Sequence, residues 1–135
     1  MKMESRDNKE DFGVKELRHF KNSIMYSLAG LKTAYKEERS LWLHLALTAV
    51  VVVLAIIFKI SVYDWILSIT ILSMVLAIEL LNTSIEACVD LVTTKHHPLA
   101  KKAKDIASSS AFMVSIFGGI CELMIFIPYF IEYFK

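Results

Sequence analysis

The chain has 135 residues, and 56% of them are hydrophobic. With a mean hydropathy of +0.51, it is too apolar for a soluble domain of this length, and it is too short for more than one domain. We therefore expect a small all-α membrane protein. The net charge of +1 hides an asymmetry, because nine of the fifteen Lys and Arg residues precede residue 40 and four more lie between residues 95 and 104.

The N-terminal third divides into two parts. Residues 1–13 are polar and contain Gly13, which predicts a flexible N-terminus that is not a signal peptide. From residue 14 to residue 37, apolar residues recur at steps of three and four, which is typical of a basic amphipathic helix lying in the headgroup plane of a membrane. A helix packed on a soluble partner is the alternative. The apolar positions are Val14, Leu17, Phe20, Ile24, Leu28, Leu31 and Tyr35.

Three apolar segments follow, and each is long enough to cross a membrane as a helix. Residues 41–58 are an almost unbroken apolar run, which at about 1.5 Å per residue gives roughly 27 Å. Residues 59–64 form a short turn, and a second span runs from Trp65 to about residue 92. Pro98 breaks the next connection, and a third span covers about residues 106–130. The surface helix and the three spans form one domain over residues 14–135.

The basic residues predict which side of the membrane each connection occupies. The N-terminal segment and the 93–105 loop are rich in Lys and Arg, whereas the 59–64 turn carries only Lys59. By the positive-inside rule, the N-terminus and the 93–105 loop are cytoplasmic, and the C-terminus lies outside.

A polar stripe interrupts the second span in its cytoplasmic half. Its residues fall at i, i+3, i+4, i+7 and i+11, so on a helix they share one narrow face. Ionisable groups at membrane depth cost about 2.5 to 3.5 kcal/mol each, and by default they mark a functional site. The stripe consists of Glu79, Asn82, Thr83, Glu86 and Asp90.

Lys101, Lys104 and Asp105 enter the third span at the same level as this stripe. Together these groups suit transfer of a phosphoryl group from a Mg²⁺-bound nucleotide. Carboxylate oxygens hold the hard cation, a lysine neutralises phosphate charge, and a further carboxylate accepts the proton of the attacking hydroxyl. The position in the membrane makes the acceptor a lipid. A glycine-rich phosphate loop is excluded, because the only glycines are Gly13, Gly30, Gly118 and Gly119.

Two segments resemble the small bacterial integral-membrane diacylglycerol kinase family. They are Glu-Leu-Leu-Asn-Thr-Ser-Ile-Glu-Ala-Cys-Val-Asp at 79–90 and Lys-His-His-Pro-Leu-Ala-Lys-Lys-Ala-Lys-Asp at 95–105. The resemblance covers about residues 19–127, including Gly30 and Glu38, and the Lys-His-His-Pro-Leu-Ala segment is most similar to the Gram-positive branch, the undecaprenol kinases. It implies an ATP-dependent lipid kinase that uses Mg²⁺ and forms a homotrimer. The implied acceptor is undecaprenol, giving undecaprenyl phosphate, and diacylglycerol is the alternative.

The resemblance also implies a role for each matching residue. Glu79 would be the general base on the lipid hydroxyl, Asn82 would orient the site, and Glu38 and Glu86 would hold Mg²⁺. Ser108 would face the lipid. The residues expected to contact the nucleotide are His19, Tyr26, Lys95, His96, His97, Lys104 and Asp105, of which the last two meet the phosphates and Asp105 also counts as catalytic.

Two residues depart from the family pattern. His19 stands where the family usually has arginine, and the adjacent Arg18 is the candidate substitute. Glu122, deep in the third span, belongs to no motif, and we interpret it as structural.

Several residues also have a structural interpretation. Buried Glu and Asn side chains can join membrane helices through hydrogen bonds. Asp90 either belongs to the site or pairs with a lysine of the 101–104 cluster. His96 and His97 precede Pro98 and fit a solvated turn, and no third ligand is spaced for zinc.

Two classes other than kinases are the alternatives for the whole chain. A small transporter would place a carboxylate near the membrane midplane, which only Glu122 satisfies. A membrane interaction protein would tolerate loss of Glu79.

One chain of this size forms a thin bundle, which is too small to enclose both a triphosphate and a lipid headgroup. We therefore expect sites shared between subunits, with the lipid and the membrane as partners and no nucleic acid. Small residues on the third span allow close approach of a neighbouring helix. They are Ala103, Ala107, Ser108, Ser109, Ser110 and Ala111.

Overall fold

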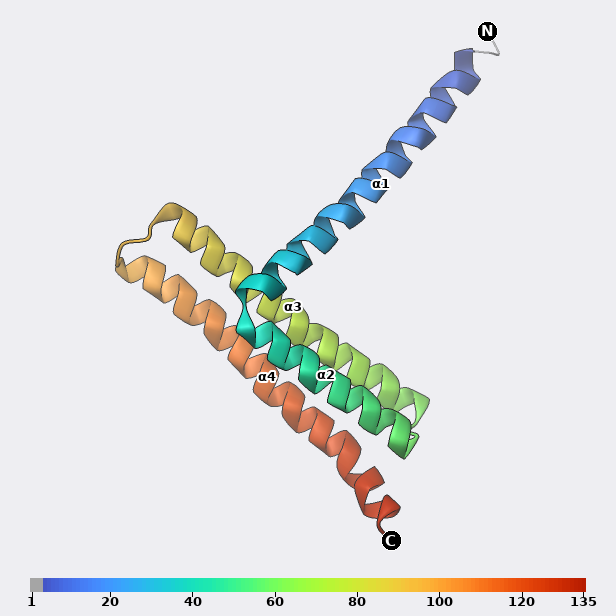
Figure 1. Cartoon of the computed structure of the whole chain (residues 1–135), viewed down its shortest axis with the longest axis vertical. Helices are drawn as coiled ribbons and strands as arrows, with labels where there is room; N and C mark the ends of the chain where they lie inside the picture. Colours follow the sequence, from blue (N-terminus) through green and yellow to red (C-terminus); the bar gives the residue numbers. More distant parts are fainter. Residues whose placement is uncertain (1–3) are drawn as a thin grey trace. The chain divides into compact units, whose positions relative to one another are not determined.

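The computed structural model describes the backbone of residues 4–135 and the side chains of residues 13–135. The described residues form α1 (Glu4–Glu37), α2 (Arg39–Phe58), α3 (Val62–Val92) and α4 (Pro98–Tyr133), without a strand (Figure 1). They fall into two compact units, which divide between Glu37 and Glu38. The predicted all-α architecture and its three helices of membrane-spanning length are confirmed.

The first helix begins earlier than its apolar repeat. α1 starts at Glu4, whereas the repeat predicts a start at residue 14. Apolar spacing locates the amphipathic part of a helix, but a helix can extend beyond it wherever no breaker intervenes. Gly13 is tolerated inside α1, since glycine in a helix interior costs only about 1 kcal/mol relative to alanine. The side chains from Val14 to Thr33 are exposed, and Ala34 is buried.

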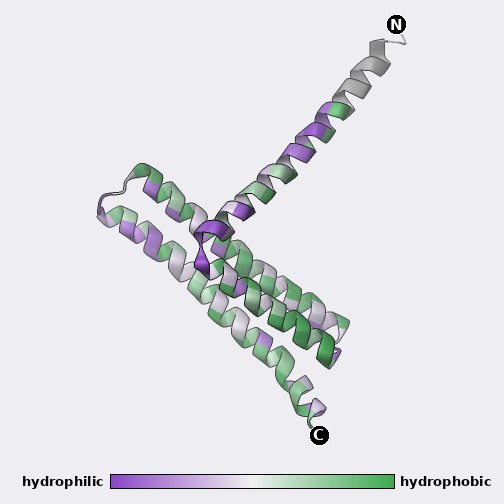
Figure 2. Ribbon diagram, in the orientation of Figure 1, coloured by the Kyte–Doolittle hydropathy of each residue, from purple (hydrophilic) through white to green (hydrophobic). Residues whose placement is uncertain are grey.

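The three apolar helices differ in length. α2 has 20 residues, or roughly 30 Å at about 1.5 Å per residue, which matches the hydrocarbon thickness of a bilayer. α3 has 31 residues and α4 has 36, so both are longer than a membrane crossing requires. Figure 2 shows hydrophobic residues along α2 and through the middle of α3 and α4, with hydrophilic residues more frequent toward the α3–α4 connection.

Pro98 starts α4 rather than lying in the loop before it. The ring nitrogen of proline cannot donate a hydrogen bond, but the first turn of a helix needs no such donor. His97 occupies the N-cap position, where its Nδ1 accepts a hydrogen bond from the backbone N–H of Leu99 at 3.2 Å. α4 therefore begins eight residues before the expected span at residue 106.

The α2–α3 connection is tight. Lys59 has a left-handed backbone, with φ of 50°, and the N–H of Ile60 donates to the carbonyl of Ala55 at 3.3 Å. Ser61 then caps α3 by accepting the N–H of Asp64 at 3.2 Å. The expected turn at 59–64 is thus shorter, because residues 62–64 already belong to α3.

α3 and α4 run antiparallel and pack closely, with α2 against both. Gly118 of α4 permits this approach, because a Cβ there would lie 3.1 Å from Cγ2 of Val75 and 3.2 Å from Cγ2 of Ile71. Ala107 and Ala111 are buried within a single chain. Of the small residues on the third span, these two therefore already serve packing inside one chain, and the serines at 108–110 remain exposed.

Candidate active site

The polar stripe lies along α3, and its residues differ in burial. Glu79 is buried, with 8% of its surface exposed. Asn82, Thr83 and Glu86 are half-buried, and Asp90 is exposed. Burial along the stripe therefore decreases from Glu79 toward the α3–α4 connection, which we call the 93–97 end.

α2 supplies the hydrogen-bond partners of Glu79. His44 Nε2 lies 2.9 Å from Glu79 Oε1, and Ser40 Oγ lies 3.5 Å from Glu79 Oε2. Sequence reasoning missed both residues, although the signal was present. His44 is the only ionisable residue between Leu41 and Phe58, and a lone ionisable group in a membrane span marks a candidate site.

These contacts set the depth of Glu79. Because the length of α2 matches the hydrocarbon thickness, the first turns of α2 lie close to the membrane boundary. Glu79 faces Ser40 and His44 in these turns, so its carboxylate lies near the boundary rather than at the midplane. α3 continues for 13 residues beyond Glu79, from residue 80 to Val92, and carries the rest of the stripe past α2.

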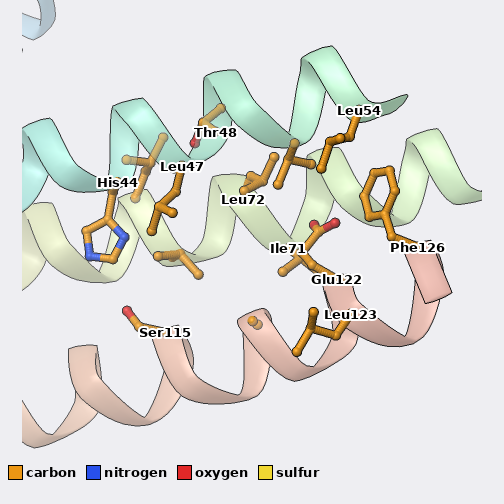
Figure 3. Close-up of a pocket in the computed structure, with 15 residues that line it drawn as sticks. His44, Leu47, Thr48, Leu54, Ile71, Leu72, Ser115, Glu122, Leu123 and Phe126 are labelled. Atoms are coloured by element: carbon orange, nitrogen blue, oxygen red, sulfur yellow. The ribbon is translucent and has the colours of Figure 1, made fainter. Parts of the chain in front are cut away.

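An apolar groove of about 410 Å³ begins beside Glu79. His44 lines one end and Phe126 the other, and the walls come from α2, α3 and α4 (Figure 3). Most lining side chains are aliphatic, and Thr48 and Ser115 add hydroxyl groups. The groove therefore offers a hydrocarbon chain an apolar surface that reaches the site.

Glu122 lies in this groove and joins two helices. It is 8% exposed, and its Oε2 accepts a hydrogen bond from Ser68 Oγ of α3 at 3.0 Å. Its Oε1 has no hydrogen-bond partner among the described residues. The hydrogen bond between α3 and α4 agrees with the structural interpretation of Glu122.

Asn82 and Glu86 form a second polar pair on α3. Asn82 Nδ2 donates to Glu86 Oε1 at 3.3 Å, and the buried Oδ1 of Asn82 has no partner among the described residues. Glu38 is the N-cap residue of α2, and its side chain makes no capping hydrogen bond. Within residues 13–135, no three His, Cys, Asp or Glu side chains are grouped as a metal site. These oxygens fit Mg²⁺ only where phosphate oxygens complete the ligand set, as is usual for nucleotide-bound Mg²⁺.

A second hollow, of about 370 Å³, lies at the 93–97 end. The fold brings five residues of the expected nucleotide site to its lining, although they come from the connection and from α4. They are Lys95, His96, His97, Lys104 and Asp105.

Two ion pairs border this hollow. Lys104 Nζ lies 2.7 Å from Asp90 Oδ1, which is the second of the two alternatives for Asp90, a pairing with a lysine of the 101–104 cluster. Lys101 Nζ lies 2.5 Å from Asp105 Oδ2 within the same helix. Lys104 and Asp105, which the resemblance assigns to the phosphates, therefore each have a partner of their own.

Four predicted residues stand apart from these clusters, and one of them is Glu38, whose side chain has no hydrogen bond to Glu79 or Glu86. Ser108 is exposed on α4. His19 and Tyr26 are exposed on α1, which belongs to the other compact unit.

The structure therefore groups Glu79 with Ser40 and His44 of α2, and Asn82 with Glu86 on α3. It groups the predicted nucleotide residues of the 93–97 connection with those of α4. His19 and Tyr26 belong to α1.

The chain is similar to known membrane kinases over most of its length. The family model of prokaryotic diacylglycerol kinase matches residues 25–126. The undecaprenol kinase of Bacillus subtilis is 33% identical over 126 residues, which cover 93% of this chain and 98% of that protein. The diacylglycerol kinases of Haemophilus influenzae and Helicobacter pylori strain J99 are 36% and 39% identical over 104 residues, or 77% of this chain, and the match covers 88% and 81% of those proteins. This chain therefore belongs to the prokaryotic diacylglycerol kinase family and is a lipid kinase.

Proposed function

We propose that this kinase transfers the terminal phosphoryl group of ATP to the hydroxyl of undecaprenol, with Glu79 as the general base. The observation that carries this proposal is the place of Glu79. Its buried carboxylate lies near the membrane boundary beside an apolar groove, with hydrogen-bond donors on both oxygens. A lipid hydroxyl at the boundary is within reach of such a base, which must approach to about 2.6–3.2 Å of the proton donor.

The groove is where the hydrocarbon chain of the acceptor lies. Its walls between His44 and Phe126 are mainly aliphatic. A polyprenol has one polar atom, its hydroxyl, which the boundary end of the groove receives. Diacylglycerol carries two ester groups close to its hydroxyl, and most of the groove wall that would bury them is aliphatic, with only the hydroxyls of Thr48 and Ser115 as neutral donors. The wall chemistry and the similarity to an undecaprenol kinase therefore favour the polyprenol.

The hollow at the 93–97 end is the proposed site of the nucleotide. Lys95 and Lys104 supply positive charge to the phosphates, and His96 and His97 supply ring surfaces for the nucleoside. Lys104 is held toward α3 by Asp90. The phosphates would lie along the exposed part of α3 and α4, between this hollow and Glu79.

The residues proposed to hold Mg²⁺ lie at the start of α2 and on α3. Glu86 and Glu38 would supply carboxylate oxygens, and the unpartnered Oδ1 of Asn82 is a further oxygen close to Glu86. Held by these residues, the cation would supply positive charge against the phosphate oxygens during transfer. Asn82 holds Glu86 through its amide nitrogen, so it orients the carboxylate toward the nucleotide.

The base assignment gives each group a task in the reaction. Glu79 accepts the hydroxyl proton as the oxygen of the acceptor attacks the terminal phosphorus. The bond from that phosphorus to the bridging oxygen breaks, and ADP leaves with that oxygen. Lys104 faces the negative charge of the phosphates, and Asp105 with Lys101 borders the same hollow.

A competition between acceptors tests this function. Purified protein in lipid micelles with ATP and Mg²⁺ should phosphorylate undecaprenol with a higher kcat/KM than diacylglycerol. Placing a polar side chain in the aliphatic wall, as in Leu47→Ser, should lower kcat/KM for undecaprenol more than for diacylglycerol. A higher kcat/KM for diacylglycerol would assign that lipid as the acceptor instead.

The proposed orientation places the N-terminus and the 93–97 end in the cytoplasm, with α1 in the headgroup plane and the C-terminus outside. The basic residues of the N-terminal segment and of 95–104 support it. In a variant without Cys88 and Cys121, a cysteine at position 61 should react with an impermeant thiol reagent added outside intact cells, whereas one at position 99 should not. The reverse labelling would place the nucleotide site outside.

The proposed assembly is a homotrimer whose active sites combine residues of different subunits. Most large apolar side chains of α2, α3 and α4 are exposed in one chain, and Ser108 is among the exposed small residues of α4. If Glu79 of one subunit acts with Asp105 of another, the inactive variants Glu79→Gln and Asp105→Asn should regain partial activity when mixed and reassembled. A site within one chain predicts that no mixture recovers activity.

A further inference from the structure

Ser40 and His44 lie one helical turn apart on α2, and both reach across to the carboxylate of Glu79 on α3. His44 Nε2 is 2.9 Å from Oε1, and Ser40 Oγ is 3.5 Å from Oε2. Each carboxylate oxygen therefore has its own donor. Neither donor belongs to the polar stripe or to the segments 79–90 and 95–105 that carry the family resemblance.

We propose that His44, assisted by Ser40, is a positioning residue that fixes the carboxylate of Glu79 in the orientation needed for proton transfer. The inference rests on the proposed role of Glu79 as the general base. It adds a residue of the first span to the reaction, and it assigns to α2 a task beyond crossing the membrane.

Burial makes this contact effective. The side chains of His44 and Glu79 are only 14% and 11% exposed, so water competes weakly for the hydrogen bond between them. A free glutamate side chain has many rotamers, and fixing one of them costs conformational entropy. Because the hydrogen bond to His44 already fixes the rotamer before the acceptor binds, this cost does not add to the barrier of proton transfer. A base that a neighbouring group orients is the usual arrangement in proton-transfer sites.

The ring of His44 also connects the base to the acceptor. His44 lines the boundary end of the groove (Figure 3), while its Nε2 lies 2.9 Å from Oε1 of Glu79. The tautomer that carries the proton on Nε2 donates to Oε1 of Glu79. The position of the ring therefore fixes where the carboxylate points relative to the end of the groove.

A purely structural tie between helices is the competing explanation, and the same bundle contains one for comparison. Ser68 Oγ donates to Glu122 Oε2 at 3.0 Å, which joins α3 to α4 by a buried hydrogen bond to a carboxyl group. Ser68 lines neither the groove nor the hollow at the 93–97 end. Ser68→Ala therefore removes a helix tie of similar kind without touching Glu79, and because its partner Glu122 lines the groove, its effect is expected on KM for the lipid and not on kcat.

The test compares kcat and KM for four variants in micelles, with the thermal unfolding of each. His44→Leu should lower kcat about 10- to 100-fold, which corresponds to loss of a hydrogen bond to a charged group, with KM for ATP unchanged. His44→Gln, whose amide nitrogen can donate to Oε1, should recover part of this loss. Ser40→Ala should lower kcat about two- to tenfold. Ser68→Ala should keep the wild-type kcat.

Other outcomes would overturn the inference. If His44→Leu kept its kcat, or lost activity only as the folded fraction fell, the contact would be a helix tie. If His44→Leu failed to fold, Ser40→Ala would decide, because it removes the second donor to Glu79 and a wild-type kcat in that variant would show that the α2 donors do not position the carboxylate. Full activity of Glu79→Gln would instead remove the general-base assignment, and that result is distinct from any result at His44.

Discussion

The two polar ends of the three-helix bundle are built in opposite ways. At the 59–61 end, Tyr129 accepts the N–H of Ser61 at 3.0 Å and donates its hydroxyl proton to Asp64, while Ser61 Oγ donates to Asp64 Oδ2 at 2.7 Å. These three residues satisfy one another. At the 93–97 end, Asn82 Oδ1 has no partner among the described residues, and lysine, histidine and carboxylate side chains line a hollow of about 370 Å³. The hollow at the 59–61 end, of about 470 Å³, has only the carboxylates Asp64 and Glu132 as charged lining. A polar cluster that satisfies itself holds helices together, whereas one with open positions can bind a ligand.

Apolar packing follows the same division. Near the 59–61 end, Phe58 contacts Phe126, Phe130 and Tyr133, with ring centroids 6.3, 6.2 and 5.4 Å apart. Beyond Glu79, α3 extends past α2 and is left with α4 as its neighbour in the described unit. At the end without a third helix, α3 and α4 present lysines and carboxylates side by side, so the length difference between α2 and α3 creates the surface on which a nucleotide is proposed to bind.

The largest expected effect is at Glu79. Glu79→Gln keeps the shape and one acceptor oxygen for the donors of α2 but cannot accept the hydroxyl proton. We expect turnover to fall by about 10² to 10⁴, with ATP binding retained. Turnover with saturating lipid and ATP affinity by equilibrium binding would be measured together. Retained turnover would show that the proton has another acceptor, and the open polar residues of α3 would then not be distinguished from the self-satisfied cluster at the 59–61 end by a catalytic role.

The next effect concerns Glu86. Glu86→Gln removes a charge while preserving size, so the Mg²⁺ concentration for half-maximal turnover should rise by at least about tenfold. Glu132→Gln, at the opposite end, is the matched control and should leave the Mg²⁺ titration unchanged. Identical titrations for Glu86→Gln and the wild type would contradict the assignment of Glu86 as a metal ligand.

A smaller effect is expected at Lys104. Lys104→Met removes the charge next to the hollow and the ion pair with Asp90, so KM for ATP should rise about tenfold, which equals about 1.4 kcal/mol of binding free energy. Lys102→Met is the control, because Lys102 is exposed on the same helix and does not line the hollow. Equal changes in KM for both variants would indicate a general charge effect rather than a contact at Lys104.

The sequence predicted the helices and the stripe because both depend on spacing along one chain. Apolar run length defined the spans, and the interval from Glu79 to Asp90 placed five polar residues on one helical face. Contacts between helices do not follow from spacing, so the partners of Glu79 on α2 were missed. The pairing of Lys104 with Asp90 was foreseen only as one alternative, because a cluster of lysines does not say which one reaches α3.

The smallest effect is expected at the 59–61 end, and it is limited to stability. Tyr129→Phe removes the hydroxyl that joins α4 to Ser61 and Asp64, which should lower the free energy of unfolding by about 0.5 to 1.5 kcal/mol. Tyr133→Phe keeps its ring contact with Phe58 and should not change stability. Thermal unfolding in micelles measures the difference, and kcat should remain at the wild-type value in both variants. A lower kcat for Tyr129→Phe at full folding would mean that the network at the 59–61 end influences the site on the far side of the bundle, and the two ends would then not be independent.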